Sequence, residues 1–308
     1  MRAAVDSDEP GIAAALAEIP QLFEMWEQCL SRFRETSELV ALNRRSGETV
    51  RVSETLWQVT RLALQAAAET DNLVTPTIID ALEVAGYTHS MVETVGAVAG
   101  HTQPIATSAA SSVPNWRSVR LDPRRRQITL RRGVRLDLAG VAKGWAADQA
   151  VRRLARVGPA MIDASGDLAF SGRRADGSEW PIGIEHPMGN SEDLPLLLLS
   201  DAAVATSTRG YHRWLKGAQW QHHLIDPRTG RPSESDVFSA TIIAPTAAQA
   251  EVGAKAAFLL GSDAGMEWIE RRPDLAALLI LENGDVITSR RLENYTWSPY
   301  ESDTPYQS

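Results

Sequence analysis

The segment from residue 136 to residue 148 constrains the fold of this chain more than any other. It reads Leu-Asp-Leu-Ala-Gly-Val-Ala-Lys-Gly-Trp-Ala-Ala-Asp: an apolar run that carries Asp137, bends at Gly140 and enters a helix expected over 142–157. The free N–H groups and positive dipole end of a helix N-terminus suit an anion such as a phosphate, and Lys143 adds a charge there. A plain strand-to-helix turn with Lys143 in water explains the residues equally well.

Length and composition are those of an ordinary globular chain. The 308 residues suffice for one large domain or two modest ones, and 44% of them are hydrophobic. No apolar run reaches the length of about 18 residues that a membrane span requires, so no membrane span is expected. The formal net charge of −8 argues against a nucleic-acid partner.

The start of the chain and its cysteine content bear on the compartment. Residues 1–10 lack the basic start and apolar core of a secretory signal, so the sequence as written predicts a cytoplasmic protein; a truncated N-terminus would leave a periplasmic or exported protein open. Cys29 is the only cysteine, which rules out an intrachain disulfide and fits a reducing compartment. Within an amphipathic helix, Cys29 is expected to be a small core residue and not a nucleophile.

Hydrophobic periodicity predicts a helical first part and a sheet-rich second part. Helices are expected over residues 12–33, 53–70, 77–84, 142–157 and 247–260. Short, turn-bounded runs predict strands at 118–121, 127–130, 134–138, 160–163, 168–170, 181–185, 196–199, 203–206, 240–244, 276–281 and 285–288. Residues 96–118 are expected to form a long connection. We predict one domain over 1–290, helical at 11–95 and sheet-rich at 117–290, followed by a polar tail at 291–308.

The run from residue 223 to residue 232, His-Leu-Ile-Asp-Pro-Arg-Thr-Gly-Arg-Pro, alternates like a strand and then turns. His223 and Ile225 then share one face of the strand. A histidine at a strand end beside a phosphoryl group is suited to act as a general base near neutral pH. The alternative is a core histidine bonded to the backbone. Asp226 is expected to brace the following turn.

Five segments, in their order along the chain, resemble those of the ApbE family, the FAD:protein FMN transferases. They are Ser37–Leu39 with Leu42–Asn43, Thr75–Thr77, residues 137–148, Val204–Ser207 and His223–Pro232. The last run is specific to the family. The other four are weak individually but form strong support when they occur together in this order. The resemblance covers roughly residues 20–290. It implies an α+β fold with mixed, mostly antiparallel sheets and packed helices around a flavin cleft.

The resemblance also implies a reaction and a set of site residues. FMN would move from FAD to a Thr or Ser hydroxyl of an acceptor flavoprotein, with release of AMP. His223 would be the general base. The residues placed on FAD are Thr75, Asp137, Lys143, Ser207 and Ile225. The turn that holds Asp163 and Asp167 would lie near the nucleotide without a catalytic role; side-chain capping of the turn is the common use of such residues.

The family uses Mg²⁺, and the resemblance assigns its ligands to the Gly140 backbone and to the positions of Glu251 and Lys255. Glu251 stands where the family has Asp, and Lys255 where it has Thr. Residues four apart share a helix face, so both are expected to face one site. A glutamate suits such a cation, but an ammonium group donates and cannot coordinate. In one interpretation, Lys255 occupies the metal position, so that Mg²⁺ binds more weakly, binds elsewhere or is dispensable. In the other, Lys255 forms an ordinary exposed helix pair with Glu251.

Two other functions stay open at this point. A non-catalytic FAD-binding protein with a degenerate metal site is favoured by Lys255 and by the short N-terminus, where residues 1–5 are expected to be the end of an early strand. An FAD pyrophosphatase would use water in place of the acceptor hydroxyl and release FMN and AMP.

Overall fold

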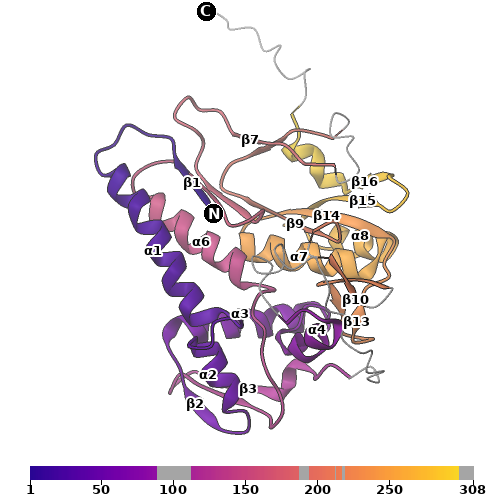
Figure 1. Ribbon diagram of the computed structural model, residues 1–308. Helices are drawn as coiled ribbons and strands as arrows, with labels where there is room; N and C mark the ends of the chain where they lie inside the picture. Colours follow the sequence, from indigo (N-terminus) through magenta and orange to yellow (C-terminus); the bar gives the residue numbers. More distant parts are fainter. Residues whose placement is uncertain (89–111, 187–193, 212, 217–218, 298–308) are drawn as a thin grey trace, which may run out of the picture.

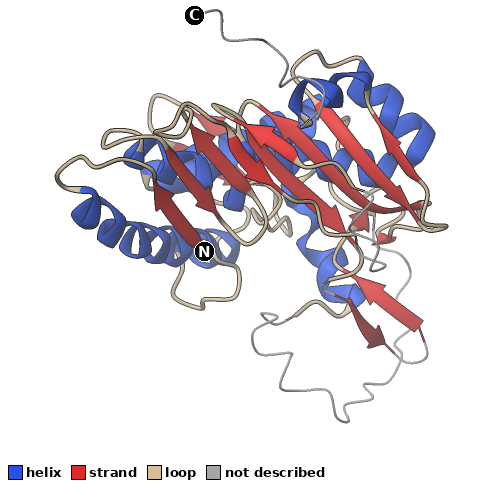
Figure 2. Ribbon diagram, turned by 90° about the horizontal axis from the view of Figure 1, so that it is seen from above, coloured by secondary structure: helices blue, strands red, loops and turns tan. Residues whose placement is uncertain are grey.

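A seven-stranded antiparallel sheet forms the centre of the structure (Figures 1 and 2). The computed structural model describes residues 1–88, 112–186, 194–211, 213–216 and 219–297. In spatial order, the strands are β1 (Arg2–Val5), β5 (Ala160–Asp163), β6 (Leu168–Ser171), β9 (Ala203–Thr208), β14 (Val237–Ala244), β15 (Ala276–Leu281) and β16 (Val286–Thr288). The expected strand at residues 1–5 is confirmed as β1, which pairs with β5.

Two helices, α6 (Ala142–Leu154) and α7 (Ala247–Leu260), pack side by side beneath this sheet (Figure 1). Small residues let the elements approach closely: a Cβ on Gly253 would lie 3.1 Å from Ile242 of β14. Helix α8 (Ser262–Glu270) follows α7 directly and packs on it. Because α7 has neighbours on most sides, its sequence is apolar nearly all round, as expected for a buried helix.

The opposite face of the sheet is covered by a hairpin and a short helix. Strands β7 (Trp180–Ile182) and β8 (Leu197–Leu199) pair, and the 3-10 helix η4 (Arg290–Tyr295) packs with them, burying Leu292. This helix forms the start of the predicted tail, and residues 298–308 lie outside the described part of the chain.

Most of the helical first part lies below the sheet in Figure 1, while α1 (Ile12–Leu30) runs upward beside α6 toward β1. The helical first part also contains α2 (Glu38–Arg44), α3 (Glu54–Glu69), the 3-10 helix η1 (Pro76–Ile78) and α4 (Ile79–Ala85). A small sheet in the order β2 (Thr49–Arg51), β4 (Gln127–Leu130) and β3 (Val119–Asp122) joins them, preceded by η2 (Trp116–Ser118). Ser53 caps α3 by accepting from the backbone N–H of Leu56. Cys29 is half-buried and packs against the core of this part.

Two short two-stranded ribbons complete the fold. They are β10 (Arg213–Lys216) with β11 (Gln219–His222), and β12 (Ile225–Asp226) with β13 (Arg231–Pro232). The α+β architecture with antiparallel sheets is confirmed, and the predicted helices and all but one of the predicted strands have counterparts in the structure. Most of the predicted connection at 96–118 lies outside the described residues.

The strand predicted at residues 134–138 is wrong. The segment forms no strand, because its backbone groups are hydrogen-bonded to other partners. The side-chain amide of Asn43 donates to the carbonyl of Leu136 (2.9 Å), and its oxygen accepts from the N–H of Leu136 (2.8 Å). The N–H of Asp137 then donates to the carbonyl of Pro76 (2.8 Å). A buried asparagine thus takes the place of a neighbouring strand.

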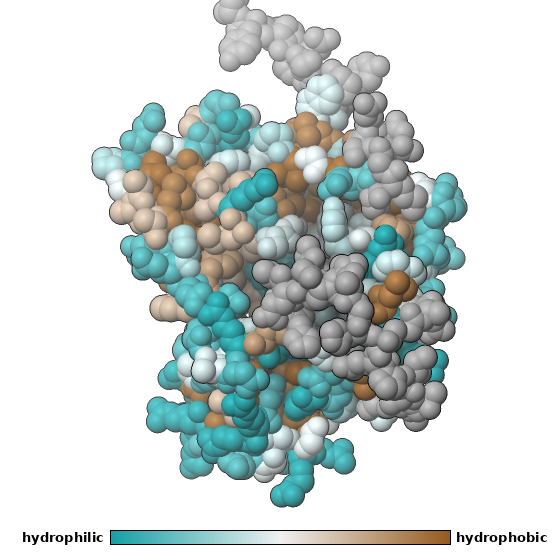
Figure 3. Space-filling model, viewed as in Figure 1, coloured by the Kyte–Doolittle hydropathy of each residue, from teal (hydrophilic) through white to brown (hydrophobic). Residues whose placement is uncertain are grey.

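The surface shown in Figure 3 carries hydrophobic side chains in separate patches between hydrophilic ones. Scattered apolar residues are normal on a folded chain. Among the described residues, none of the helices combines the length and apolar character needed to cross a membrane.

Candidate functional site

A cavity of about 660 Å³ lies where the helical first part meets α7 and β9. Its walls come from the η1 region, the loop before α6, the turn after β5, strand β9, the segment before β12 and helix α7. All but one of the residues placed at the site from the sequence line this cavity: Thr75, Asp137, Gly140, Lys143, Ser207, His223, Ile225 and Lys255. Glu251 is the exception. It is 1% exposed and lies beneath the cavity floor, next to Lys143 and Lys255.

The N-terminus of α6 binds a carboxylate of the chain itself. The backbone N–H of Gly144 donates to Glu251 Oε2 (3.0 Å), and Lys143 Nζ donates to Glu251 Oε1 (2.8 Å). Lys143 also forms an ion pair with Asp167. This helix start therefore binds an anionic group, Glu251 of the chain itself, while a phosphate there stays a prediction. Lys143 is 45% exposed but is paired with two carboxylates and not with water alone.

Lys143, Asp167, Glu251 and Lys255 together form what we call the lysine–carboxylate cluster. Lys255 Nζ lies 3.0 Å from Glu251 Oε1, so this oxygen accepts from both ammonium groups. The carboxylates are nearly inaccessible, whereas 45% of the Lys143 side chain is exposed and faces the cavity. Two cations and two carboxylates thus meet at one wall of the cavity.

The cluster shifts the pKa values of its members in ways that keep Glu251 and Lys143 charged at neutral pH. Burial alone would raise the pKa of Glu251, but the ammonium groups of Lys143 and Lys255 bring it below its usual range. Burial would lower the pKa of Lys143, but Asp167 and Glu251 raise it. For Asp167, burial outweighs the effect of Lys143 and raises the pKa to about 6.

The residues at the expected magnesium position do not fit that ion. Both oxygens of Glu251 already accept hydrogen bonds, and the Lys255 ammonium has no lone pair to donate. A Cβ placed on Gly140 would lie 4.0 Å from Cε of Lys255, so the lysine stem runs between Gly140 and Glu251. Among the described residues, no three His, Cys, Asp or Glu side chains are grouped so as to hold a metal.

Asp137 is held by an arginine that the sequence analysis missed. Arg32 Nε lies 2.8 Å from Asp137 Oδ2, and both side chains are at most 5% exposed. The N–H of Ala139 donates to the other oxygen, Asp137 Oδ1 (2.7 Å). The rings of Phe33 and Tyr87 flank the guanidinium, with centroids 4.1 and 4.7 Å from its central carbon. Asp137 therefore fixes the loop before α6, and its charge is already neutralised.

The remaining site residues line other parts of the cavity wall. The hydroxyl of Thr75 lies 2.8 Å from that of Thr77, at the start of η1. Ser207 is buried on β9, opposite Ala240. The ring of His223 lies 6.5 Å from that of Tyr87, centroid to centroid. These groups surround the open side of the lysine–carboxylate cluster.

The aspartates of the two turns singled out in the sequence, at 163–167 and 226–230, have different partners. Asp163 accepts from the N–H of Gly166 (2.8 Å), which confirms the capped turn. Asp167 instead turns inward to Lys143, a contact that the sequence analysis did not find. The carbonyl of Asp226 accepts from Thr229 and Gly230 (3.1 and 2.8 Å), so its role as a turn brace is confirmed.

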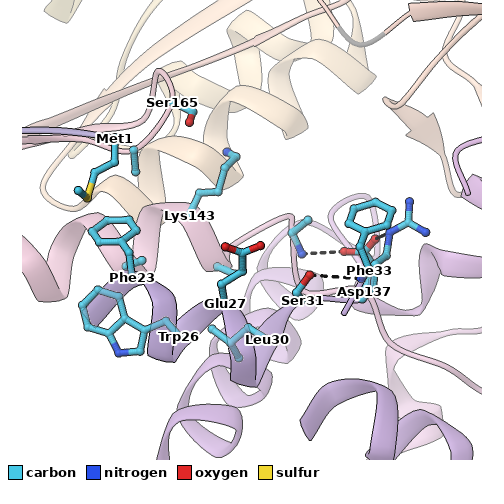
Figure 4. Close-up of a pocket in the computed structure, with 15 residues that line it drawn as sticks. Met1, Phe23, Trp26, Glu27, Leu30, Ser31, Phe33, Asp137, Lys143 and Ser165 are labelled. Atoms are coloured by element: carbon cyan, nitrogen blue, oxygen red, sulfur yellow. Dashed lines mark hydrogen bonds and ion pairs between the residues drawn. The ribbon is translucent and has the colours of Figure 1, made fainter. Parts of the chain in front are cut away.

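A second cavity of about 270 Å³ adjoins the first and shares Asp137, Ala139, Lys143 and Ser165 with it. Figure 4 shows Phe23 and Trp26 of α1 on one side of it, and Lys143 extending toward Ser165. The two aromatic rings pack edge to face, 5.3 Å apart. The cleft thus has an apolar, aromatic chamber and a larger chamber whose lining holds more polar groups, with Lys143 between them, and suits a ligand that combines flat rings with phosphates.

Sequence comparison relates most of the chain to flavin transferases. A sequence model of the ApbE family matches residues 2–279. The FAD:protein FMN transferase of Treponema pallidum is 30% identical over 302 residues, covering 90% of this chain and 80% of the relative. The FAD:protein FMN transferase of Klebsiella pneumoniae is 26% identical over 299 residues, covering 94% and 89%.

Structure comparison agrees on the fold. The crystal structure of the ApbE protein from Thermotoga maritima superposes with a TM-score of 0.82 at 24% identity, covering 96% of this chain and 94% of that one. The apo form of the flavinyl transferase ApbE from Pseudomonas stutzeri gives a TM-score of 0.79 at 21% identity, covering 94% and 90%. The match of the family model over nearly the whole chain, together with these relatives, places the chain: it belongs to the ApbE family.

Proposed function

We propose that this chain is an FAD:protein FMN transferase, which moves FMN from FAD to a Thr or Ser hydroxyl of an acceptor protein. The observation that carries the proposal is the cavity itself. It brings Lys143, held at the start of α6, into one chamber with His223 and with the hydroxyls of Thr75 and Ser207. Family membership and the names of the relatives support it.

In this reaction, the acceptor oxygen attacks the phosphorus atom of the FMN half of FAD. The bond from that phosphorus to the bridging oxygen breaks, AMP leaves, and the hydroxyl proton passes to a base. His223 takes this proton, since an imidazole is the side chain best matched to neutral pH. Lys143 faces the phosphates and offsets the negative charge that concentrates there as the bond breaks.

The other predicted residues bind and orient FAD. Thr75 and Ser207 offer hydroxyl groups to phosphate or flavin oxygens. Ile225 supplies an apolar wall, and Asp137 acts by fixing the loop that carries Lys143. The aromatic chamber around Phe23 and Trp26 accommodates a planar ring of FAD.

Mg²⁺ has no place in this account, because Glu251 and Lys255 do not offer it ligands as they stand. The lysine at position 255, in place of a metal ligand, also favours a second candidate function, that of a non-catalytic FAD-binding protein. That protein would use the same cavity without turnover, and an FAD pyrophosphatase would release AMP without any acceptor.

The test uses the purified chain with FAD and an extract of its source cells. Flavin fluorescence in a denaturing gel detects covalent transfer, and chromatography detects AMP. A fluorescent protein band that needs both the chain and FAD, with AMP released alongside, supports the transferase. FAD binding without band or AMP supports the binding protein, and AMP without a band supports the hydrolase.

A further inference from the structure

We infer that the ammonium group of Lys255 is a built-in cation that takes the place of a divalent metal in this cavity, so that FAD binds through its pyrophosphate without Mg²⁺. This inference rests on the proposed function, because it concerns the same site and the same ligand. It is based on the position of Lys255, on its bonding partners and on the small number of lysines in the chain.

The position of Lys255 is the one in which a metal would meet Gly140 and Glu251. Its ammonium lies 3.0 Å from Glu251 Oε1, and its Cε would lie 4.0 Å from a Cβ on Gly140. The side chain is 19% exposed and lines the cavity. The charge is therefore fixed at the cavity wall and remains within reach of a ligand.

The partners of Glu251 leave no free ligand for a metal in that place. Oε1 accepts from Lys143 and Lys255, and Oε2 accepts from the N–H of Gly144. A divalent ion would have to displace both ammonium groups from a carboxylate that is 1% exposed. The displaced ammonium groups would then face the ion at short range, and like charges at short range repel strongly in a poorly solvated site.

The charge balance favours an anionic ligand above the cluster. Lys143 and Lys255 carry two positive charges, and Glu251 and Asp167 offset them from below. Lys143 and Lys255 are 45% and 19% exposed in the cavity, whereas Glu251 and Asp167 are at most 4% exposed, although Asp167 also borders the cavity. A pyrophosphate therefore meets ammonium donors first, and charge-assisted hydrogen bonds to phosphate oxygens are among the strong ones.

The choice of lysine here is unusual for this chain. Of its 31 basic residues only three are lysines, Lys143, Lys216 and Lys255, and two of these three belong to the cluster. A guanidinium is planar and spreads its charge over three nitrogens, whereas an ammonium is a compact point charge with three donors. Only the compact group approximates a small metal ion between Glu251 and Gly140.

The experiment measures FAD binding by titration calorimetry, in EDTA and in MgCl₂, for the wild-type chain, for Lys255→Thr and for the control Lys216→Thr. Lys216 is exposed, bonds to the carbonyl of Val84 and is not part of the cavity lining, so its loss removes the same charge elsewhere. For the wild type and the control, we expect the dissociation constant to change by less than about threefold between the buffers. For Lys255→Thr, we expect binding about tenfold or more weaker in EDTA, recovered in MgCl₂.

Binding of Mn²⁺, followed by electron paramagnetic resonance, gives a second readout that does not need FAD. We expect Mn²⁺ binding in Lys255→Thr and markedly weaker binding in the wild type. Wild-type FAD binding that improves tenfold or more with Mg²⁺ would overturn this inference and leave the proposed function standing. A failure of the wild type to bind FAD in either buffer would instead overturn the proposed function, and this inference with it.

Discussion

Lys143 and Glu251 are 108 residues apart in the sequence, yet Nζ of the first lies 2.8 Å from Oε1 of the second. The contact joins the start of α6 to the middle of α7, and the N–H of Gly144 adds a second bond to the same carboxylate (3.0 Å). This ion pair connects the core helices α6 and α7, and it also holds the Lys143 ammonium group at the cavity wall.

Removal of the Glu251 charge should destabilise the fold. In Glu251→Gln, two lysines and the α6 N-terminus lose their shared carboxylate, so the free energy of unfolding should fall by about 2 kcal/mol. Urea denaturation at neutral pH measures this change in the free energy of unfolding. The matched control is Glu267→Gln on α8, where the carboxylate is 63% exposed and pairs with Arg271; its effect should stay within about 0.5 kcal/mol. Equal losses in both variants would contradict a structural role for Glu251.

A methyl group at Gly144 should push α6 and α7 apart. A Cβ there would lie 2.5 Å from the carbonyl oxygen of Ala247 and 2.6 Å from the nitrogen of Ala248, which are rigid backbone atoms. Gly144→Ala should therefore cost about 1–3 kcal/mol or more of unfolding free energy. Gly183→Ala, where nothing lies within 4 Å, serves as the control and should be near neutral. Unchanged stability of Gly144→Ala would show that the two helices are not in this close contact.

The thiol of Cys29 should behave as a packed group and not as a nucleophile. Burial, together with the nearby carboxylate of Glu38, raises its pKa to about 12. Since the thiolate is the reactive form, its alkylation by iodoacetamide should become about tenfold faster for each pH unit between 7 and 10, without a plateau. The same chain in denaturant is the control and should level off above about pH 8.5. A plateau at that pH in the folded protein would refute the raised pKa.

Loss of His223 should separate transfer from binding. In His223→Gln, the rate of FMN transfer should fall about 100-fold or more, because the proton of the acceptor hydroxyl has no base. FAD affinity, measured by calorimetry, should change by less than about threefold, since the imidazole acts in the chemical step. The neighbouring His222, which bonds to the carbonyl of Ser233 (3.0 Å) and does not line the cavity, provides the control variant His222→Gln. Parallel losses of binding and transfer in His223→Gln would make it a binding residue.

Local patterns in the sequence were enough to predict most elements of the fold. The apolar spacing from Ile12 onward, the Ser53 cap and the small-residue run of α7 each fix a helix through contacts near in sequence. Residues 134–138 show where such patterns fail. They resemble a strand because apolar and charged residues alternate there, but Asn43 supplies the hydrogen bonds, and no local signal reveals a partner 93 residues away.

The site residues likewise fall into those that local patterns predict and those that depend on contacts between distant segments. Lys143 at a helix start could be predicted from the local pattern. Helix geometry predicted that Glu251 and Lys255 share one face, but only the resemblance to the ApbE family placed them at the site. The contacts of Arg32 and Asp167 could not be predicted in this way, because each residue meets its partner, Asp137 or Lys143, only through the packing of separate elements. A charged residue next to a predicted helix end, as Arg32 is, was the one signal available.

The measurement that tests the central claim most directly is mass spectrometry of the protein that becomes fluorescent when the purified chain and FAD are added to the cell extract. The account predicts a Thr- or Ser-containing peptide of that protein heavier by one FMN less one water, with one AMP released for each modification, and a much weaker signal with His223→Gln. A tightly bound, intact FAD with no modified peptide and no AMP would contradict it.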